Sequence, residues 1–237
     1  MRNLVAVMDS GVGGITTLSE IIKAVKGCDF IYFADKKYAP YGDKTDIEIR
    51  MRLKYLASAF FQMGASALVI ACNTATNVCI DVLRKEYPSK IIVGTEPAIK
   101  IASACGGKTA LLVTPLTARQ KKLEALIGKY AKNCHIYIMN DLASLVENNI
   151  KNLENLHEHF EERLRFLNDY ENVVLGCTHY VFLKPFLRDN FPHLRVFEGN
   201  QGVANRLKFL LQNSCLDQTK IMSTIRFISD ERDIFAH

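Results

Sequence analysis

The chain has 237 residues, of which 49% are hydrophobic and 23% charged, and its formal net charge is +5. Such a chain buries roughly 70% of its unfolded surface, and this composition excludes a disordered chain or a coiled coil. Its lysines cluster only in pairs, such as Lys36-Lys37 and Lys121-Lys122, so we expect no nucleic-acid partner.

Eight short apolar runs are predicted to form β-strands. Their nearly continuous apolar character is typical of strands buried on both faces of a parallel sheet. Amphipathic helices are predicted between them, most clearly from Thr45 to Met63, where Thr45 and Glu48 have capping-box spacing and Gly64 ends the helix. The runs are Leu4–Met8, Phe30–Ala34, Ala67–Ala71, Ile91–Val93, Thr109–Val113, His135–Met139, Val173–Gly176 and Leu194–Phe197.

A faint internal repeat divides the chain. The segments around Cys72 and Cys177 each consist of a buried strand, a small residue, a cysteine and a polar helix start, 105 residues apart. We therefore expect an α/β fold of two similar doubly wound parallel-sheet domains, with ligands bound at the carboxyl ends of the strands. The expected domains are 1–95 plus 208–237, carrying Cys72, and 96–207, carrying Cys177.

The location of the protein is predicted from what the sequence lacks. No apolar run approaches the roughly 18 residues that a membrane helix needs. The first apolar run meets Asp9 too early for a signal peptide, so we expect a cytoplasmic protein with no membrane partner. The seven cysteines, Cys215 included, are expected to be thiols rather than a disulfide framework.

Cys72 lies between a predicted strand and a predicted helix. The positive end of the helix dipole is expected to lower the pKa of its thiol. The following Asn73 and Thr74, with nearby backbone N–H groups, could bind a carboxylate. The alternative is a buried cysteine that only packs.

Cys177 has the same setting and is followed by Thr178 and His179. Thr178 could donate to an anion, and His179 could relay a proton or hold a thiolate. Alternatively, Thr178 is a helix cap and His179 a core residue. Cys177 and His179 could also be two zinc ligands, but no Cys-x-x-Cys and no second histidine pair completes a tetrahedron, so we predict no metal.

A glycine-rich loop, Asp9-Ser10-Gly11-Val12-Gly13-Gly14, follows the first strand. It fits neither the Rossmann nor the Walker spacing, because Thr16 stands where the Rossmann glycine belongs and no Lys-Ser/Thr pair follows. Its glycines favour a tight turn and close approach to a small ligand. Asp9 could bind an ammonium group, orient a thiol or cap a helix.

Two thiols on facing halves suggest one mechanism. A planar carbanion beside a carboxylate can be formed by proton removal from one face and quenched from the other. This chemistry needs two acid–base groups on opposite sides and no prosthetic group, so we expect no cofactor.

Four motifs together resemble the glutamate racemase family, within the aspartate/glutamate racemase superfamily. They are Asp-Ser-Gly-Val-Gly-Gly at 9–14, Pro-Tyr-Gly at 40–42, Ala-Cys-Asn-Thr at 71–74 and Gly-Cys-Thr-His-Tyr at 176–180. The resemblance implies a cofactor-independent racemase that acts on glutamate and supplies D-glutamate for peptidoglycan. It also implies two α/β domains with the active site between them, and a homodimer.

The resemblance assigns roles by position. Cys72 and Cys177 resemble the two proton donors and acceptors, Cys72 serving D-glutamate and Cys177 L-glutamate. Asp9 resembles the group that assists the first thiol, and Glu147 and His179 those that assist the second. The positions that resemble substrate contacts are Ser10, Pro40, Tyr41, Gly42, Asn73, Thr74, Thr114, Thr117 and Thr178.

The chain departs from the family pattern in two places. Asn200-Gln201 stands where the family has an aspartate-serine pair, and Ile228-Ser229-Asp230 where it has Thr-Thr-Gly-Asp. Two other functions stay open: a racemase of aspartate or another acidic amino acid, and a non-catalytic homologue that binds an amino acid.

Overall fold

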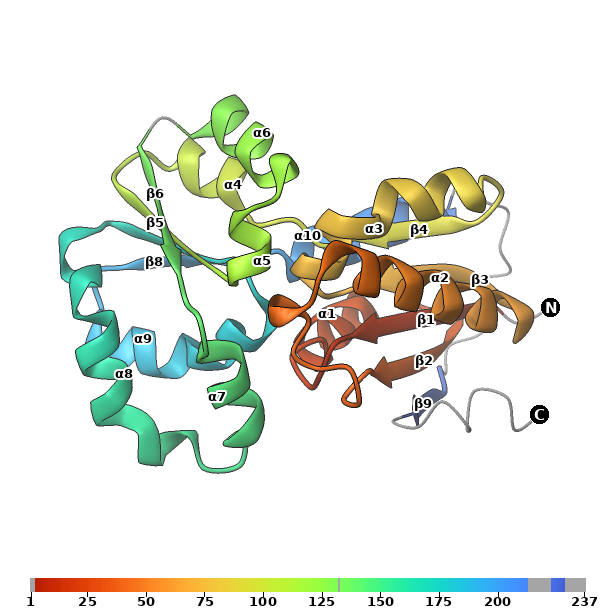
Figure 1. Cartoon of the computed structure of the whole chain (residues 1–237), viewed down its shortest axis with the longest axis horizontal. Coiled ribbons are helices and arrows are strands. Elements are labelled where there is room, and N and C mark those ends of the chain that lie inside the picture. The colour runs from red at the N-terminus through yellow and green to blue at the C-terminus, as the bar shows by residue number, and fades with distance from the viewer. Residues whose placement is uncertain (1–2, 132, 213–222, 229–237) are drawn as a thin grey trace.

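The hydrophobic strands assemble into two separate parallel sheets, as the computed structural model shows for residues 3–131, 133–212 and 223–228 (Figure 1). The first sheet has the order β4-β3-β1-β2-β9, and neighbouring strands are parallel throughout. Its strands are β1 (Asn3–Asp9), β2 (Cys28–Ala34), β3 (Ala65–Ile70), β4 (Ile91–Gly94) and β9 (Ile225–Ile228).

The second sheet has the order β6-β5-β7-β8 and is also parallel. Its strands are β5 (Thr109–Val113), β6 (Cys134–Ile138), β7 (Asn172–Leu175) and β8 (Arg195–Phe197). Figure 1 shows the two sheets in separate lobes, with the short helix α5 (Pro115–Ala118) near the junction.

Helices cover both faces of each sheet. On the first sheet, α1 (Ile15–Ala24) and α10 (Asn200–Gln212) bury one face, and α2 (Asp46–Gln62) and α3 (Asn73–Glu86) bury the other. On the second, one core includes helices α7 to α9 and the other includes α4 and α6. Their bounds are α4 (Ile99–Ala104), α6 (Lys121–Tyr130), α7 (Leu142–Asn148), α8 (His157–Leu164) and α9 (Lys184–Asn190), with 3-10 turns at η1 (Tyr41–Asp43), η2 (Leu153–Leu156), η3 (Arg165–Asp169) and η4 (Thr178–Leu183).

The predicted elements are confirmed. All eight strands form within two residues of their expected ends. The Thr45–Glu48 capping box is present, and Gly64 adopts a φ of 90° after α2, a conformation that a residue with a Cβ rarely adopts. The expected burial on both faces fails at the sheet edge, where Ile136 and Ile138 of β6 are exposed.

One strand, β9, was not predicted. It has four residues and pairs with β2 at the edge of the first sheet, where Ile225 and Phe227 are exposed. A run this short with little burial carries no clear apolar pattern.

The chain returns to the first domain through α10. Val203, Ala204 and Leu207 of this helix belong to the core beneath α1, so the predicted boundary between 207 and 208 falls inside a helix that packs on the first sheet. The predicted domain limits otherwise stay a prediction. Cys215, Ser229 and Asp230 lie outside the described residues.

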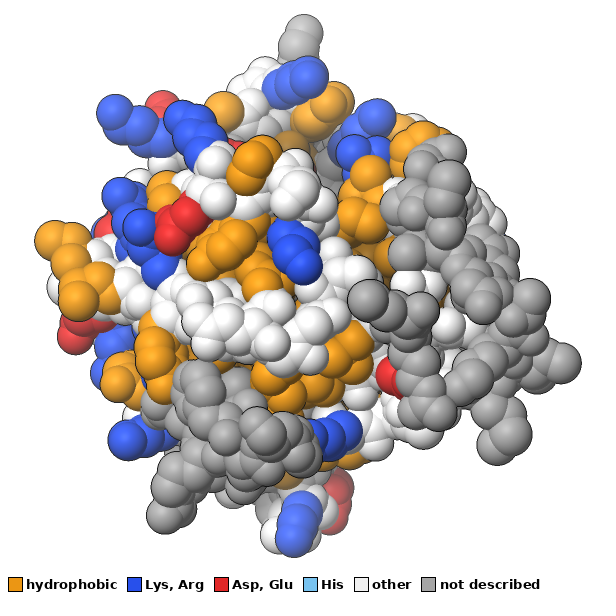
Figure 2. Space-filling model, turned by 90° about the vertical axis from the view of Figure 1, so that its right-hand side faces the viewer, with side chains coloured by type: hydrophobic (Ala, Val, Ile, Leu, Met, Phe, Trp, Pro, Cys, Tyr) orange, Lys and Arg blue, Asp and Glu red, His pale blue; other side chains and the backbone are white. Residues whose placement is uncertain are grey.

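The end of the molecule that carries the first sheet is drawn in Figure 2. Lysine and arginine side chains are scattered on this face among hydrophobic ones rather than gathered in a stripe. Within the described ranges, no helix combines the length and the apolar character required to cross a membrane.

Candidate active site

The carboxyl ends of strands from both sheets meet at one cavity of about 560 Å³. Parallel strands bring the loops that follow them to the same edge, so Cys72, after β3, and Cys177, after β7, line this cavity together. The lining residues are Ser10, Lys36, Ala39, Pro40, Tyr41, Gly42, Cys72, Thr74, Thr114, Ala143, Ser144, Glu147, Asn148, Cys177 and His179.

Cys72 is the N-cap residue of α3 and is 5% exposed. Its burial, and next the charge of Asp9, raise the pKa of the thiol well above its usual range, although the Ala75 N–H and the Ser10 hydroxyl act in the opposite direction. The predicted lowering of the pKa by the helix terminus is therefore wrong. Desolvation outweighs the helix N–H groups, and Cys72 favours the thiol form.

Cys177 occupies the equivalent position before η4 and has a different neighbour. Its Sγ lies 3.7 Å from Nδ1 of His179, whose Nε2 lies 2.6 Å from Oε2 of Glu147. Burial acts to lower the pKa of His179, but hydrogen bonds to Cys177 and Glu147, with the charges of Cys177 and Asp9, raise it well above its usual range. Nδ1 of His179 is therefore placed to exchange a proton with the Cys177 sulfur.

Glu147 connects the two domains. It lies on α7 of the second domain, and its Oε2 accepts a hydrogen bond from the Val12 N–H of the first, with an N···O distance of 2.8 Å. Burial acts to raise its pKa, but the bonds from His179 and Val12 lower it overall. A Cβ at Gly11 would meet the Glu147 carboxylate, which would then have to shift away from its bonds to His179 and Val12.

Asp9 lies at the end of β1 and is fully buried. Its Oδ2 accepts hydrogen bonds from the Gly14 N–H, at 2.5 Å, and from the Thr178 hydroxyl, at 3.0 Å. Among the described residues its Oδ1 has no hydrogen-bond partner. Burial raises the pKa of Asp9, while the charge of His179 lowers it. Asp9 therefore joins the glycine loop to the Cys177 turn.

Three threonines form a cluster between the domains. Thr74, from α3, lies 3.0 Å from both Thr114 and Thr117 through the hydroxyl oxygens. Thr114 is the N-cap of α5 and accepts a hydrogen bond from the Thr117 N–H. Thr74 and Thr114 line the cavity, and Thr117 supports them from behind.

The structure thus brings the predicted site residues together in two layers. Asp9, Asn73, Thr117 and Thr178 are buried behind the ten predicted residues that line the cavity. Five of the lining residues were not predicted. Ser144 lies one helical turn before Glu147 on α7, so helical spacing from Glu147 could have found it, and Asn148 lies one turn after Ser144. Lys36 could have been found by its position after β2, whereas Ala39 and Ala143 carry no signal.

The departure at Asn200 has a structural consequence. Asn200 is 3% exposed, accepts a hydrogen bond from Thr17 at 2.7 Å and donates one to Thr16 at 3.0 Å. It therefore fixes the start of α10, where the chain re-enters the first domain, to α1. Across the described part of the chain, no group of three histidine, cysteine or acidic side chains is placed to hold a metal ion.

The cavity brings two cysteines of opposite domains together beside a histidine and a carboxylate, groups that can serve in acid–base chemistry. The chain matches the Asp/Glu/Hydantoin racemase family over residues 7–207. It is 37% identical over 214 residues to a glutamate racemase of Leptospira interrogans, covering 88% of this chain and 82% of that protein. It is 35% identical over 219 residues to a glutamate racemase of Clostridium botulinum, covering 90% and 85%.

A solved structure agrees with these relatives. The Escherichia coli glutamate racemase, in complex with L-glutamate and the activator UDP-MurNAc-ala, superposes with a TM-score of 0.83 at 30% identity, covering 96% of this chain and 89% of that one. The chain therefore belongs to the Asp/Glu/hydantoin racemase family. Within that family its similarity is to the glutamate racemases.

Proposed function

We propose that this protein is a cofactor-independent glutamate racemase that supplies D-glutamate for peptidoglycan in the cytoplasm and acts as a homodimer. The observation that carries the proposal is that Cys72 and Cys177 come from different domains and line one cavity. Two thiols on opposite sides of a substrate supply the base and the acid that inversion at a carbon requires.

The protonation states favoured by the site support one direction of attack. Cys177 lies beside His179, whose pKa is raised, and Cys72 has a raised pKa of its own. The Cys177 thiolate would remove the α-proton of L-glutamate, and the Cys72 thiol would donate a proton to the opposite face. The product is D-glutamate, with a Cys177 thiol and a Cys72 thiolate, and the reverse reaction begins from that state.

The surrounding polar groups suit an amino acid dicarboxylate. Asp9 lies behind the lining with one oxygen unpaired among the described residues, and its charge acts on Cys72, which suits a role in orienting that thiol. The hydroxyls of Ser10, Thr74 and Thr114 line the cavity and can donate to carboxylates. The loop of Pro40, Tyr41 and Gly42 closes another side.

The test is turnover of L-glutamate beside L-aspartate by the purified protein. Racemisation of glutamate after dialysis against a chelator, with aspartate turned over far more slowly, is the expected result. Faster turnover of aspartate would replace glutamate by another acidic amino acid as substrate. Binding of glutamate without turnover would indicate a non-catalytic homologue, and activity that zinc restores after chelation would overturn the cofactor-independent mechanism.

A further inference from the structure

The Pro40–Gly42 loop closes one side of the cavity that Cys72 and Cys177 line, which we call the thiol cavity. This loop is attached to a buried ion pair that lies outside the thiol cavity. Asp35, directly after β2, is 1% exposed. Its carboxylate accepts two hydrogen bonds from Arg52 of α2, from Nε at 2.8 Å and from Nη2 at 2.7 Å. The Tyr41 hydroxyl donates to the same carboxylate at 2.5 Å.

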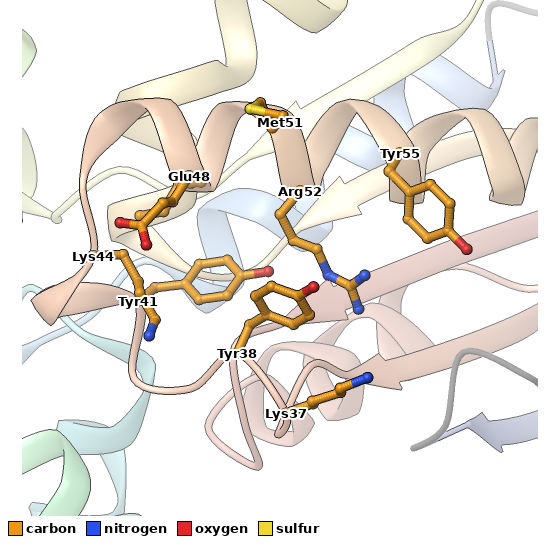
Figure 3. A pocket seen from close by; sticks show the side chains of 9 residues that line it. Lys37, Tyr38, Tyr41, Lys44, Glu48, Met51, Arg52 and Tyr55 are labelled. Atoms are coloured by element: carbon orange, nitrogen blue, oxygen red, sulfur yellow. The ribbon is translucent and has the colours of Figure 1, made fainter.

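Arg52 lies at the inner side of a second cavity, of about 690 Å³. Its guanidinium stacks on the Tyr38 ring, 4.1 Å from the centroid. Figure 3 shows Tyr38 and Tyr41, from the loop, on one side of this guanidinium and Tyr55, from α2, on the other. Tyr41 lines both cavities. A contact made in the second cavity therefore reaches the thiol cavity through one side chain.

The other end of this connection touches the second domain and Asp9. A Cβ at Gly42 would lie 3.1 Å from the Cβ of Thr114, so the loop is packed closely against the threonine cluster. The Asp35 N–H donates to the Asp9 carbonyl oxygen at 2.9 Å. Asp35 thus fixes the loop relative to the end of β1.

We propose that Arg52 is a positioning residue, which acts through Asp35 and Tyr41 to fix the Pro40–Gly42 wall at its working distance from the two thiols. The inference rests on the proposed racemase function for its kinetic consequences. A bidentate guanidinium–carboxylate pair fixes orientation as well as charge, which a lysine does not reproduce. Without Arg52, the Asp35 carboxylate is buried without its counter-ion, and Tyr41 loses a fixed acceptor.

The test compares Arg52→Ala and Arg52→Lys with Arg50→Ala. Arg50 is an exposed arginine of the same helix, and its replacement by alanine changes the charge by the same amount as Arg52→Ala. Arg52→Ala is expected to lower kcat/KM for glutamate on the order of 10²-fold, the scale of a small misplacement of reacting groups. Arg52→Lys should recover only part of this loss, and Arg50→Ala should match the wild type. Added ethylguanidinium should enter the second cavity and restore Arg52→Ala saturably, which a general loss of folding would not allow.

A second measurement does not depend on turnover. Cys72 is buried and Cys105 is exposed, so their relative rates of alkylation by iodoacetamide, read by mass spectrometry, report how closed the thiol cavity is. Arg52→Ala should raise the ratio of Cys72 to Cys105 alkylation, and ethylguanidinium should reverse the increase. If the wild type does not racemise glutamate but Arg52→Ala still shifts this ratio, the proposed function fails. The positioning role of Arg52 is then still supported.

A folded Arg52→Ala variant with unchanged kcat/KM and an unchanged alkylation ratio would overturn the inference. If Arg52→Ala does not fold, Tyr41→Phe decides, because it removes only the hydroxyl that meets Asp35. A Tyr41→Phe variant with wild-type kinetics and a wild-type alkylation ratio would then overturn it, and a shift in both would support it.

Discussion

The Glu147 carboxylate lies 2.6 Å from the His179 imidazole and, through the same oxygen, 2.8 Å from the Val12 N–H of the opposite domain. His179 in turn contacts Cys177 through its other ring nitrogen. One carboxylate oxygen therefore sets the orientation and charge of the imidazole beside a thiol and also joins the two domains. In the proposed racemase, the proton chemistry at Cys177 therefore depends on a carboxylate that also joins the two domains.

Replacement of His179 by asparagine tests its link to Cys177. An imidazolium that stabilises one thiolate acts mainly in the transition state, so kcat should fall by roughly 10²- to 10⁴-fold with a smaller change in binding. The two enantiomers are equally stable, so the asymmetry must appear in separate kcat and KM values and in isotope effects. The α-deuterium isotope effect should increase more from L-glutamate than from D-glutamate, and equal changes in both directions would reduce His179 to a packing or substrate contact.

The Glu147–His179 pair should also give stability a defined pH dependence. The pKa of His179 is raised, so its contribution is fully present below its unfolded value of 6.5 and is lost as pH rises through the folded pKa. The pKa of Glu147 is lowered, so its contribution is present above 4.5 and is lost as pH falls through the folded pKa. The pair therefore stabilises most between those two values.

Urea unfolding of the wild type and Glu147→Gln checks this window. The difference in unfolding free energy should be larger at about pH 5.5 than at about pH 9. Glu158→Gln, an exposed position on α8, is the matched control and should show no such change. A Glu147→Gln difference that is the same at both pH values would mean that the ion pair does not form.

Close packing of the glycine loop predicts a selective effect of a single methyl group. A Cβ at Gly13 would lie 2.8 Å from the His179 backbone nitrogen and would collide with the Thr178 hydroxyl. Gly13→Ala should cost about 1–3 kcal/mol of stability and lower activity, because the Cys177 turn must move. Gly128→Ala on α6 meets no atom within 4 Å among the described residues and should instead stabilise by about 0.5–1 kcal/mol. Equal effects of the two substitutions in thermal unfolding would contradict this packing.

Much of the fold was predictable because buried parallel strands leave a strong local signal. The runs around Val7, Val69 and Leu111 are apolar on both faces and form strands where expected. The edge strand β9 and the start of α10 have no such signal, because partners distant in sequence determine them. Gln201 is exposed while the adjacent Asn200 is buried against α1, a difference that composition cannot show.

The residues that line the cavity were more predictable than the electrostatics around them. The motifs identified ten residues that line the cavity. The pKa of Cys72 was predicted in the wrong direction, because a helix N-terminus is visible in the sequence and the depth of burial is not. Arg52 and Asp35, 17 residues apart, were missed because only the turn from β2 into α2 brings them together.

The most direct test of the two-thiol mechanism is to measure the racemisation of each glutamate enantiomer by Cys72→Ser, by Cys177→Ser and by the wild type. Each direction needs one thiolate and one thiol on opposite faces, so each variant should lose racemisation of both enantiomers, while proton exchange or elimination from a single enantiomer can survive. Circular dichroism of both variants checks that the fold is intact. Racemisation of both enantiomers at the wild-type rate by either serine variant would contradict the two-thiol mechanism.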